Sequence, residues 1–154
     1  VSDGSMKMEH EDKLKYIDKL SKDFQVLSEV GSKVKGVELP DEVWVRNMRT
    51  ELDHGAWKVI AEARESGTIG IYNSNGSANS TLIDDIIAHV EVENVLWEAP
   101  LKNQQVWFIN LIGANVNLGN IASHEVVPLE ALRLGLRGDT FFNFLPEELQ
   151  DKKL

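Results

Sequence analysis

The sequence predicts an α/β protein with a parallel sheet, and three observations support this. Short apolar segments rich in β-branched residues alternate with longer segments whose apolar residues recur at helical spacing. The resulting order, strand then helix, repeats along the chain and is typical of parallel sheets with right-handed crossovers. Three glutamates, Glu29, Glu62 and Glu98, lie at corresponding places in successive predicted strands, 33 and 36 residues apart, and this spacing is near the roughly 30 residues of one (β/α)8 barrel unit.

Four strands are predicted, over residues 24–30, 57–62, 95–98 and 115–118. Each is short and nearly continuously apolar before its polar end. That pattern favours a sheet covered on both faces over one with a solvated face.

Five helices are predicted, over residues 10–22, 41–54, 80–90, 101–112 and 124–136. The second begins at Asp41, expected to be its N-cap after Pro40, and ends before Gly55. Between strand and helix, residues 67–79 are rich in Gly, Ser and Asn. We expect this segment to be a mobile loop over a site.

Composition excludes several function classes. The chain has 154 residues, no cysteine and a formal net charge of −9. Disulfides, thiolate zinc sites and cysteine nucleophiles are therefore excluded. The sequence has no basic stripe of the kind that nucleic-acid-binding proteins carry. No segment reaches the roughly 20 apolar residues that span a membrane. The first residues are polar and acidic, unlike a targeting peptide, so we expect a cytoplasmic protein. An acidic protein can still bind an anion in a cleft that gathers its few cations.

The expected site lies where parallel strands end. Carboxylates there suit Mg²⁺, which takes oxygen ligands together with water and substrate oxygens. Lys33 and Arg64 follow the first two glutamates and would hold a phosphate or carboxylate. The alternative is that the glutamates pair with these cations or with backbone groups inside the sheet.

Residues 117–121 form a predicted strand end, a glycine-containing turn and a helix start. Backbone N–H groups at such a start can bind phosphate, although an ordinary βα loop is the favoured interpretation. The four histidines, His10, His54, His89 and His124, fall at helix ends without metal-ligand spacing, and we expect them to be surface or capping residues.

Several stretches together resemble phosphosulfolactate synthases. They are SDGS (2–5), LSEVGSK (27–33), IAEARESG (60–67), LWEAPLKNQQ (96–105), NVNLGNI (115–121) and PLEALRLGLRGDTF (128–141). The similarity runs over most of the chain in the same order. It implies a TIM (β/α)8 barrel, of which residues 1–145 form the C-terminal part, from the end of strand 4 through unit 8. Residues 146–154 are expected to be a solvated tail.

The resemblance also implies a reaction. Enzymes of this family add sulfite to phosphoenolpyruvate with Mg²⁺, giving 2-phospho-3-sulfolactate, which leads to coenzyme M or to sulfolactate. The implied catalytic residues are Lys33, as general acid, with Glu62 and Arg64. The implied metal ligands are Glu29, Glu62 and Glu98. The implied substrate-binding residues are Ser2, Asp3, Arg64, Asn117, Gly119, Asn120 and Arg137.

Two rival functions stay open. One is a non-catalytic relative, similar to plant heat-stress-associated proteins, and the other is a different phosphoenolpyruvate-utilising barrel enzyme. Because a partial barrel exposes two sheet edges, three states are open: two copies pair as a homo-oligomer, the chain is longer, or the segment is inactive alone.

Overall fold

The computed structural model describes residues 1–3, 6, 8–32 and 39–150. Its strands are β1 (Val26–Val30), β2 (Ala56–Ala61), β3 (Val95–Glu98) and β4 (Leu118–Gly119). Its α-helices are α1 (His10–Leu20), α2 (Asp41–Asp53), α3 (Ser80–His89), α4 (Lys102–Ile112), α5 (Val126–Arg133) and α6 (Glu147–Gln150). Three short 3-10 helices are η1 (Val92–Asn94), η2 (Ser123–Glu125) and η3 (Phe141–Phe144).

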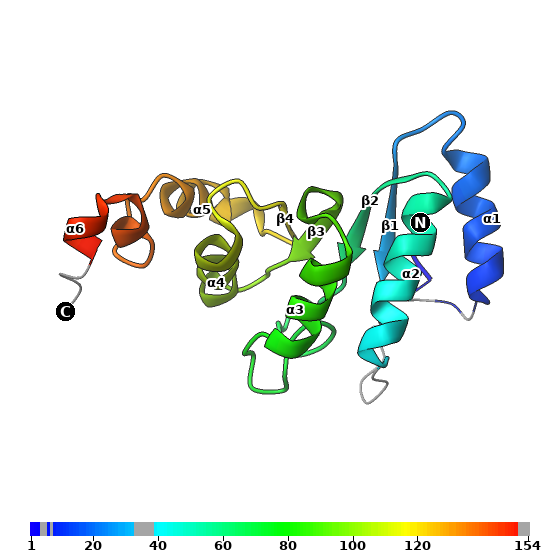
Figure 1. Ribbon diagram of the computed structural model, residues 1–154, viewed down its shortest axis with the longest axis horizontal. Helices are drawn as coiled ribbons and strands as arrows, with labels where there is room; N and C mark the ends of the chain where they lie inside the picture. The colour runs from blue at the N-terminus through cyan, green and yellow to red at the C-terminus, as the bar shows by residue number, and fades with distance from the viewer. Residues whose placement is uncertain (4–5, 7, 33–38, 151–154) are drawn as a thin grey trace.

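The four strands form one sheet in the order β1-β2-β3-β4, and every neighbouring pair is parallel. This confirms the predicted α/β class and is the arrangement of consecutive units of a (β/α)8 barrel. In Figure 1 the elements follow one another from α1 and β1 at one side to α5 and α6 at the other, so the described chain is elongated. In the part of the chain that is described, no helix is long and apolar enough to cross a membrane.

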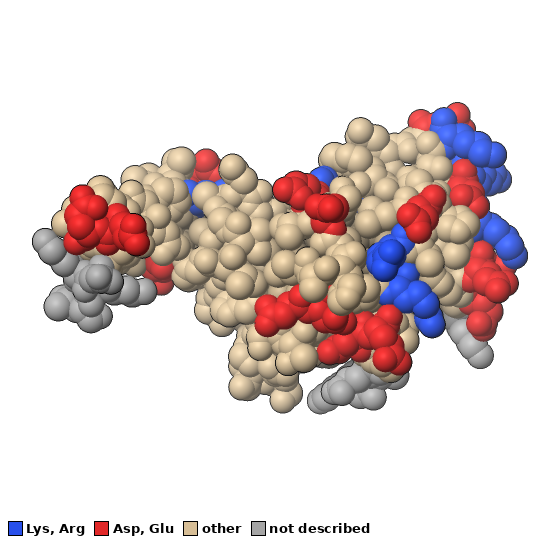
Figure 2. Space-filling model, in the orientation of Figure 1, with Lys and Arg blue, Asp and Glu red and all other residues tan. Residues whose placement is uncertain are grey.

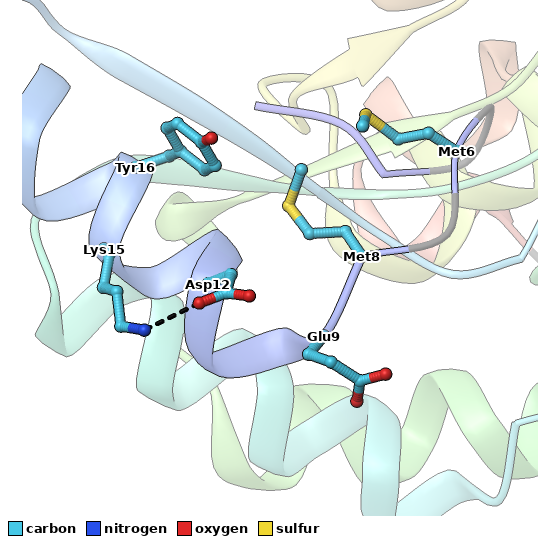
Figure 3. A pocket seen from close by; sticks show the side chains of 6 residues that line it. All are labelled: Met6, Met8, Glu9, Asp12, Lys15 and Tyr16. Atoms are coloured by element: carbon cyan, nitrogen blue, oxygen red, sulfur yellow. Dashed lines mark hydrogen bonds and ion pairs between the residues drawn. The ribbon is translucent and has the colours of Figure 1, made fainter.

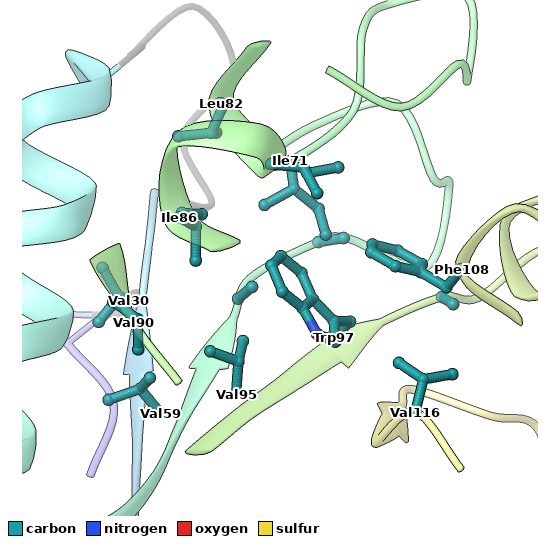
Figure 4. Packing of buried hydrophobic residues seen from close by; sticks show 14 of the residues in the cluster. Val30, Val59, Ile71, Leu82, Ile86, Val90, Val95, Trp97, Phe108 and Val116 are labelled. Carbon is teal, nitrogen blue, oxygen red and sulfur yellow. The ribbon is translucent and has the colours of Figure 1, made fainter. Parts of the chain in front are cut away.

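The core lies between the sheet and helices α2, α3 and α4. Side chains alternate along each strand, and those that face the helices are fully buried, including Val59, Val95 and Trp97. They pack against Ile86 of α3 and Phe108 of α4 (Figure 4). The Trp97 and Phe108 rings lie 5.0 Å apart between centroids.

The other face of the sheet carries a different set of side chains. Glu29 pairs in register with Ile60, and Ile60 with Leu96, so these three point to the same face. All three are only half buried. The same alternation places Glu62 and Glu98 on this face, one step further along β2 and β3.

Several element ends differ from the predictions, and two of the helices show why. The helix predicted to be capped by Asp41 begins with that residue, and Pro40 is the N-cap, with no side-chain capping bond. The last predicted helix, 124–136, divides into η2 and α5. It ends early because Gly135, at φ +67°, lets the Leu136 and Gly135 N–H groups bond to the Ala131 and Leu132 carbonyls, as in a Schellman motif.

The fourth strand is shorter than predicted. Only Leu118 and Gly119 pair with β3, opposite Trp97 and Glu98. Before them the chain turns, with the Val116 N–H bonded to the Gly113 carbonyl at 3.2 Å. The Asn117 side chain donates to the Glu93 and Val95 carbonyls at 3.0 and 3.1 Å, which links the start of β4 to the start of β3.

We expect Phe108→Ala to destabilise the complete protein by about 3–5 kcal/mol, because it removes a fully buried ring from the centre of the core. The measurement is the free energy of unfolding in urea. Lys15→Ala is the control: it removes only a surface ion pair to Asp12, and exposed ion pairs contribute little to stability. A Phe108 loss no larger than this control would contradict the described core.

Candidate metal centre at the strand ends

Three carboxylates converge where β1, β2 and β3 end. One oxygen from each of Glu29, Glu62 and Glu98 lies within 4.8 Å of the other two. Glu62 is 1% exposed, and the other two are half buried. Ionised carboxylates this close repel one another, and burial increases the cost of the repulsion. A bound divalent cation would remove the repulsion, and three carboxylate oxygens are donors that Mg²⁺ accepts. The described residues therefore fit the ion that the sequence predicted.

Backbone contacts fix Glu62 on both sides. Its N–H donates to the Val30 carbonyl at 3.1 Å, and its carbonyl accepts from the Ile71 N–H at 3.1 Å. Gly70 makes the second contact possible. It has φ +81°, and a Cβ added there would lie 2.0 Å from the Glu62 carbonyl oxygen, so only glycine fits against this strand end.

Glu98 is oriented by two groups of the loop after β2. The Ala63 N–H donates to Glu98 Oε2 at 2.7 Å, and the Tyr72 hydroxyl donates to the Glu98 carbonyl at 2.6 Å. Burial raises the pKa of the Tyr72 hydroxyl far above its usual value, and the Glu98 carboxylate raises it further. Tyr72 therefore stays protonated and remains a donor at any physiological pH.

Glu29 accepts a hydrogen bond from Ser2. The Ser2 hydroxyl donates to Glu29 Oε1 at 3.0 Å, so this predicted substrate-binding residue contacts a predicted metal ligand. Asp3, predicted for the same role, lies 3.3 Å from the ammonium of Lys13. Lys33, predicted to be the general acid, lies outside the described residues.

An open cleft of about 580 Å³ lies beside the three carboxylates. It is lined by Glu62, Ala63, Arg64, Glu65, Ser66, Ile69, Glu98 and Asn120. Arg64 is exposed and is the one basic residue in this described lining. Its guanidinium is therefore the positive group available to an anion in the cleft, as the sequence predicted.

The segment after β4 contributes Asn120. Its backbone has φ +56°, a left-handed conformation that Asn adopts more readily than most residues. Its side-chain amide donates to the Ala63 carbonyl at 3.0 Å. The Ala63 peptide is thus held at both ends, by Asn120 and by Glu98, and Asn120 supports the cleft as well as lining it.

Three other predicted residues do not line this cleft. Asn117 bonds to the start of β3, as described above. Gly119 pairs with Glu98, and its carbonyl accepts from the Ala99 N–H at 3.0 Å. Arg137 is exposed beyond the end of α5. Its neighbour in the same motif, Arg133, donates to the Ala114 and Val116 carbonyls and so fastens α5 beneath β4.

The loop predicted to be mobile is tied to α4. Gln104, which is 2% exposed, donates from Nε2 to the Gly67 and Gly76 carbonyls at 2.8 and 3.1 Å. Antiparallel bridges join Ala63 to Gly70 and Tyr72 to Ala78. The segment that carries Arg64 is therefore held in place by buried hydrogen bonds. Sequence reasoning missed Gln104, whose position inside a polar helix start gave no distinguishing signal.

His54 and His89 lie at helix ends, as expected, whereas the half-buried His10 ring contacts the buried Glu51 carboxylate. His54 is 3.0 Å from Asp18, and the His89 ring contacts the Asp85 carbonyl at 2.8 Å.

A second pocket lies beside α1 and is lined by Met6, Met8, Glu9, Asp12, Lys15 and Tyr16, with the Lys15–Asp12 ion pair among them (Figure 3). It shares no lining residue with the cleft.

Charge is spread unevenly over the surface. On the face shown in Figure 2, the basic side chains lie mainly over α1 and α2, with acidic side chains among them. They form no continuous basic stripe on this face.

Two substitutions of Asn120 should separate the effect of its side-chain hydrogen bond from the effect of its left-handed backbone conformation. Asn120→Gly keeps the left-handed backbone but leaves the Ala63 carbonyl without its donor, which costs about 1 kcal/mol. Asn120→Ala loses the same bond and also strains the backbone by a further 1–2 kcal/mol or so. Urea unfolding of the complete protein measures both. Equal losses would show that backbone strain has no part here.

Comparison with known proteins identifies the family of the chain. The family model described as (2R)-phospho-3-sulfolactate synthase (ComA) matches residues 1–139. The chain is 46% identical over 147 residues to the phosphosulfolactate synthase of Bacillus subtilis (strain 168), covering 92% of this chain and 58% of that protein. It is 44% identical over 146 residues to the phosphosulfolactate synthase of Methanocaldococcus jannaschii, with the same coverage.

The phosphosulfolactate synthase of Methanothermobacter thermautotrophicus is 42% identical over 144 residues. The chain thus spans somewhat more than half the length of the curated relatives it matches. The family match covers the strand ends, the cleft and the segment after β4. The chain therefore belongs to the (2R)-phospho-3-sulfolactate synthase family.

Proposed function

We propose that the protein containing this chain is a phosphosulfolactate synthase, which adds sulfite to phosphoenolpyruvate in a Mg²⁺-dependent reaction. The observation that carries the proposal is the convergence of three carboxylates within 4.8 Å at the ends of parallel strands, in a chain of this family. The substrates and the product are expectations from the family resemblance. The geometry supports them because it places three carboxylates, which could hold a cation, beside a cleft that Arg64 lines.

The proposed reaction forms one carbon–sulfur bond. The sulfite lone pair attacks the methylene carbon of phosphoenolpyruvate, and the electrons of the double bond move toward the carboxylate. A proton then reaches the carbon that carries the phosphate. Bound Mg²⁺ would supply electrostatic stabilisation of the negative charge on the substrate carboxylate. No other co-reactant is needed.

The chain's own residues divide this work. Glu29, Glu62 and Glu98 would hold the metal, directly or through water. Arg64, exposed in the same cleft, would bind the phosphate or the sulfite by charge-assisted hydrogen bonds. The buried hydrogen bonds from Gln104 to the loop after β2 keep Arg64 in the cleft that Glu62 and Glu98 also line. Lys33, outside the described residues, is the proposed proton donor.

The direct test incubates the complete protein with phosphoenolpyruvate, sulfite and Mg²⁺ and detects 2-phospho-3-sulfolactate by mass spectrometry. Product that disappears with EDTA and returns with Mg²⁺ supports the proposal. A folded protein that makes no product excludes synthase activity and favours the non-catalytic alternative. Consumption of phosphoenolpyruvate without sulfite would instead favour another enzyme that uses this substrate.

Glu62→Gln should weaken metal binding and lower turnover, because it removes one negative ligand from the centre of the cluster. The expected loss in metal affinity exceeds the roughly 10–100-fold that outer-shell changes cost. Glu65→Gln is the matched control: it removes an exposed carboxylate that lines the same cleft outside the cluster. Isothermal titration with Mg²⁺ measures both variants, and similar losses would argue against the assigned ligands.

Lys33→Ala should lower kcat by about 10²–10⁴-fold, the usual contribution of general acid catalysis, while Mg²⁺ affinity changes little. Steady-state kinetics and metal titration of the same protein sample separate the two effects. Unchanged kcat would remove Lys33 from its proposed role and leave the metal site intact.

A further inference from the structure

A lysine is buried at the back of the metal cluster. Lys13 lies in α1, and its side chain is 2% exposed. Its ammonium lies 2.9 Å from Glu51 Oε1, 2.5 Å from the Glu29 carbonyl oxygen and 3.3 Å from Asp3 Oδ1. Three N–H donors thus meet three acceptors, one from each of three separate segments of the chain.

The partner of Lys13 is buried even more completely. Glu51, on α2, is 0% exposed, and the His10 ring also contacts its Oε1, at 3.2 Å. The pair therefore joins α1 to α2 away from solvent. Buried ion pairs of this kind are weak sources of stability, since apolar side chains of similar volume often stabilise a fold equally well. Stability alone does not account for a charged pair here.

The contact between Lys13 and the Glu29 carbonyl connects the pair to the candidate metal centre. Lys13 holds the backbone carbonyl of Glu29, while the Glu29 N–H donates to the Val1 carbonyl at 2.9 Å. Both sides of the Glu29 backbone are thereby fixed. Through Asp3, Lys13 also holds the segment whose Ser2 hydroxyl donates to the Glu29 carboxylate.

We propose that Lys13, with Glu51 as its counter-ion, is a positioning residue of the metal centre. By fixing the Glu29 backbone and the Ser2–Asp3 segment together, it holds the Glu29 carboxylate within reach of Glu62 and Glu98. It touches neither metal nor substrate. This inference rests on the metal centre of the proposed function and adds the residue that sets the place of one ligand.

Removing one partner and removing both have different consequences. Lys13→Met removes the ammonium beside the buried Glu51 carboxylate and leaves only the His10 ring in contact with it among the described partners, so it lowers both stability and metal affinity. Lys13→Met with Glu51→Leu replaces the pair by apolar side chains, which restores packing without restoring the hydrogen bond to the Glu29 carbonyl. The positioning role predicts that stability recovers in the double variant and metal affinity does not.

The experiment measures Mn²⁺ binding by electron paramagnetic resonance and the thermal midpoint of the complete protein, for the wild type and both variants. We expect a roughly 10–100-fold loss of Mn²⁺ affinity in the double variant, as for other outer-shell changes, at a near wild-type midpoint. Asp18→Ala is the matched control. It removes an exposed contact to His54 that also joins α1 to α2, and it should leave Mn²⁺ affinity unchanged.

The outcomes distinguish the positioning role of Lys13 from the proposed metal centre itself. Wild-type Mn²⁺ affinity in the double variant overturns the positioning role and leaves the proposed metal centre standing. A wild-type protein that binds no Mn²⁺ overturns both. If Lys13→Met alone does not fold, the double variant, which has no unpaired buried charge, gives the answer.

Discussion

The rest of the site depends on the repulsion between three carboxylates that the sheet brings to one place. Parallel strands that run in register end at one edge, so side chains in equivalent positions must meet there. Glu62 is almost fully buried at this edge, with Glu29 and Glu98 beside it. Such an arrangement persists only if the surrounding groups hold the carboxylates and a positive charge compensates them.

The surrounding contacts are accordingly dense and come from segments far apart in sequence. The Ala63 N–H and the Ser2 hydroxyl bond to carboxylate oxygens, and Tyr72 bonds to the backbone of Glu98. Gln104 and Asn120 in turn hold the loop that supplies Ala63 and Tyr72. Because most of these groups are buried, the three carboxylates are held in place without an ion, which would reduce the cost of ordering them if one binds.

Sequence reasoning found the parts of this design that follow from periodicity. Glu29, Glu62 and Glu98 could be identified because each closes an apolar run, and strand ends are where parallel sheets place their sites. Asn117 was expected near the carboxyl end of a strand over residues 115–118, but β4 is Leu118–Gly119. Asn117 therefore precedes the strand, and its side chain bonds to the start of β3. In so short a strand, a start three residues later than predicted moves a side chain from the carboxyl end of the sheet to its amino end.

Lys13 and Glu51 were missed for a different reason. Each lies on the buried side of its helix, near the core residues Ile17 and Met48. A charged residue in an apolar stripe is a detectable signal, since such residues are rarely buried without a partner. The partner, however, is on another helix, 38 residues away in the sequence, and only the packing of α1 on α2 brings the two together. Long-range pairing of this kind is not encoded in any local pattern.

The negative charge of the chain gives a bound metal ion a specific role in the proposed chemistry, which is to offset the carboxylates before anionic substrates bind. Phosphoenolpyruvate and sulfite are both anions, the chain carries a formal charge of −9, and Arg64 alone provides a positive side chain in the described cleft lining. Three carboxylates beside that cleft would oppose the approach of either substrate, because like charges repel one another at short range. A divalent cation held by those carboxylates reverses the local sign and, with Arg64, gives the cleft two positive centres. On this argument the acidic cluster and the anionic substrates are compatible only through the ion, so metal binding should precede substrate binding.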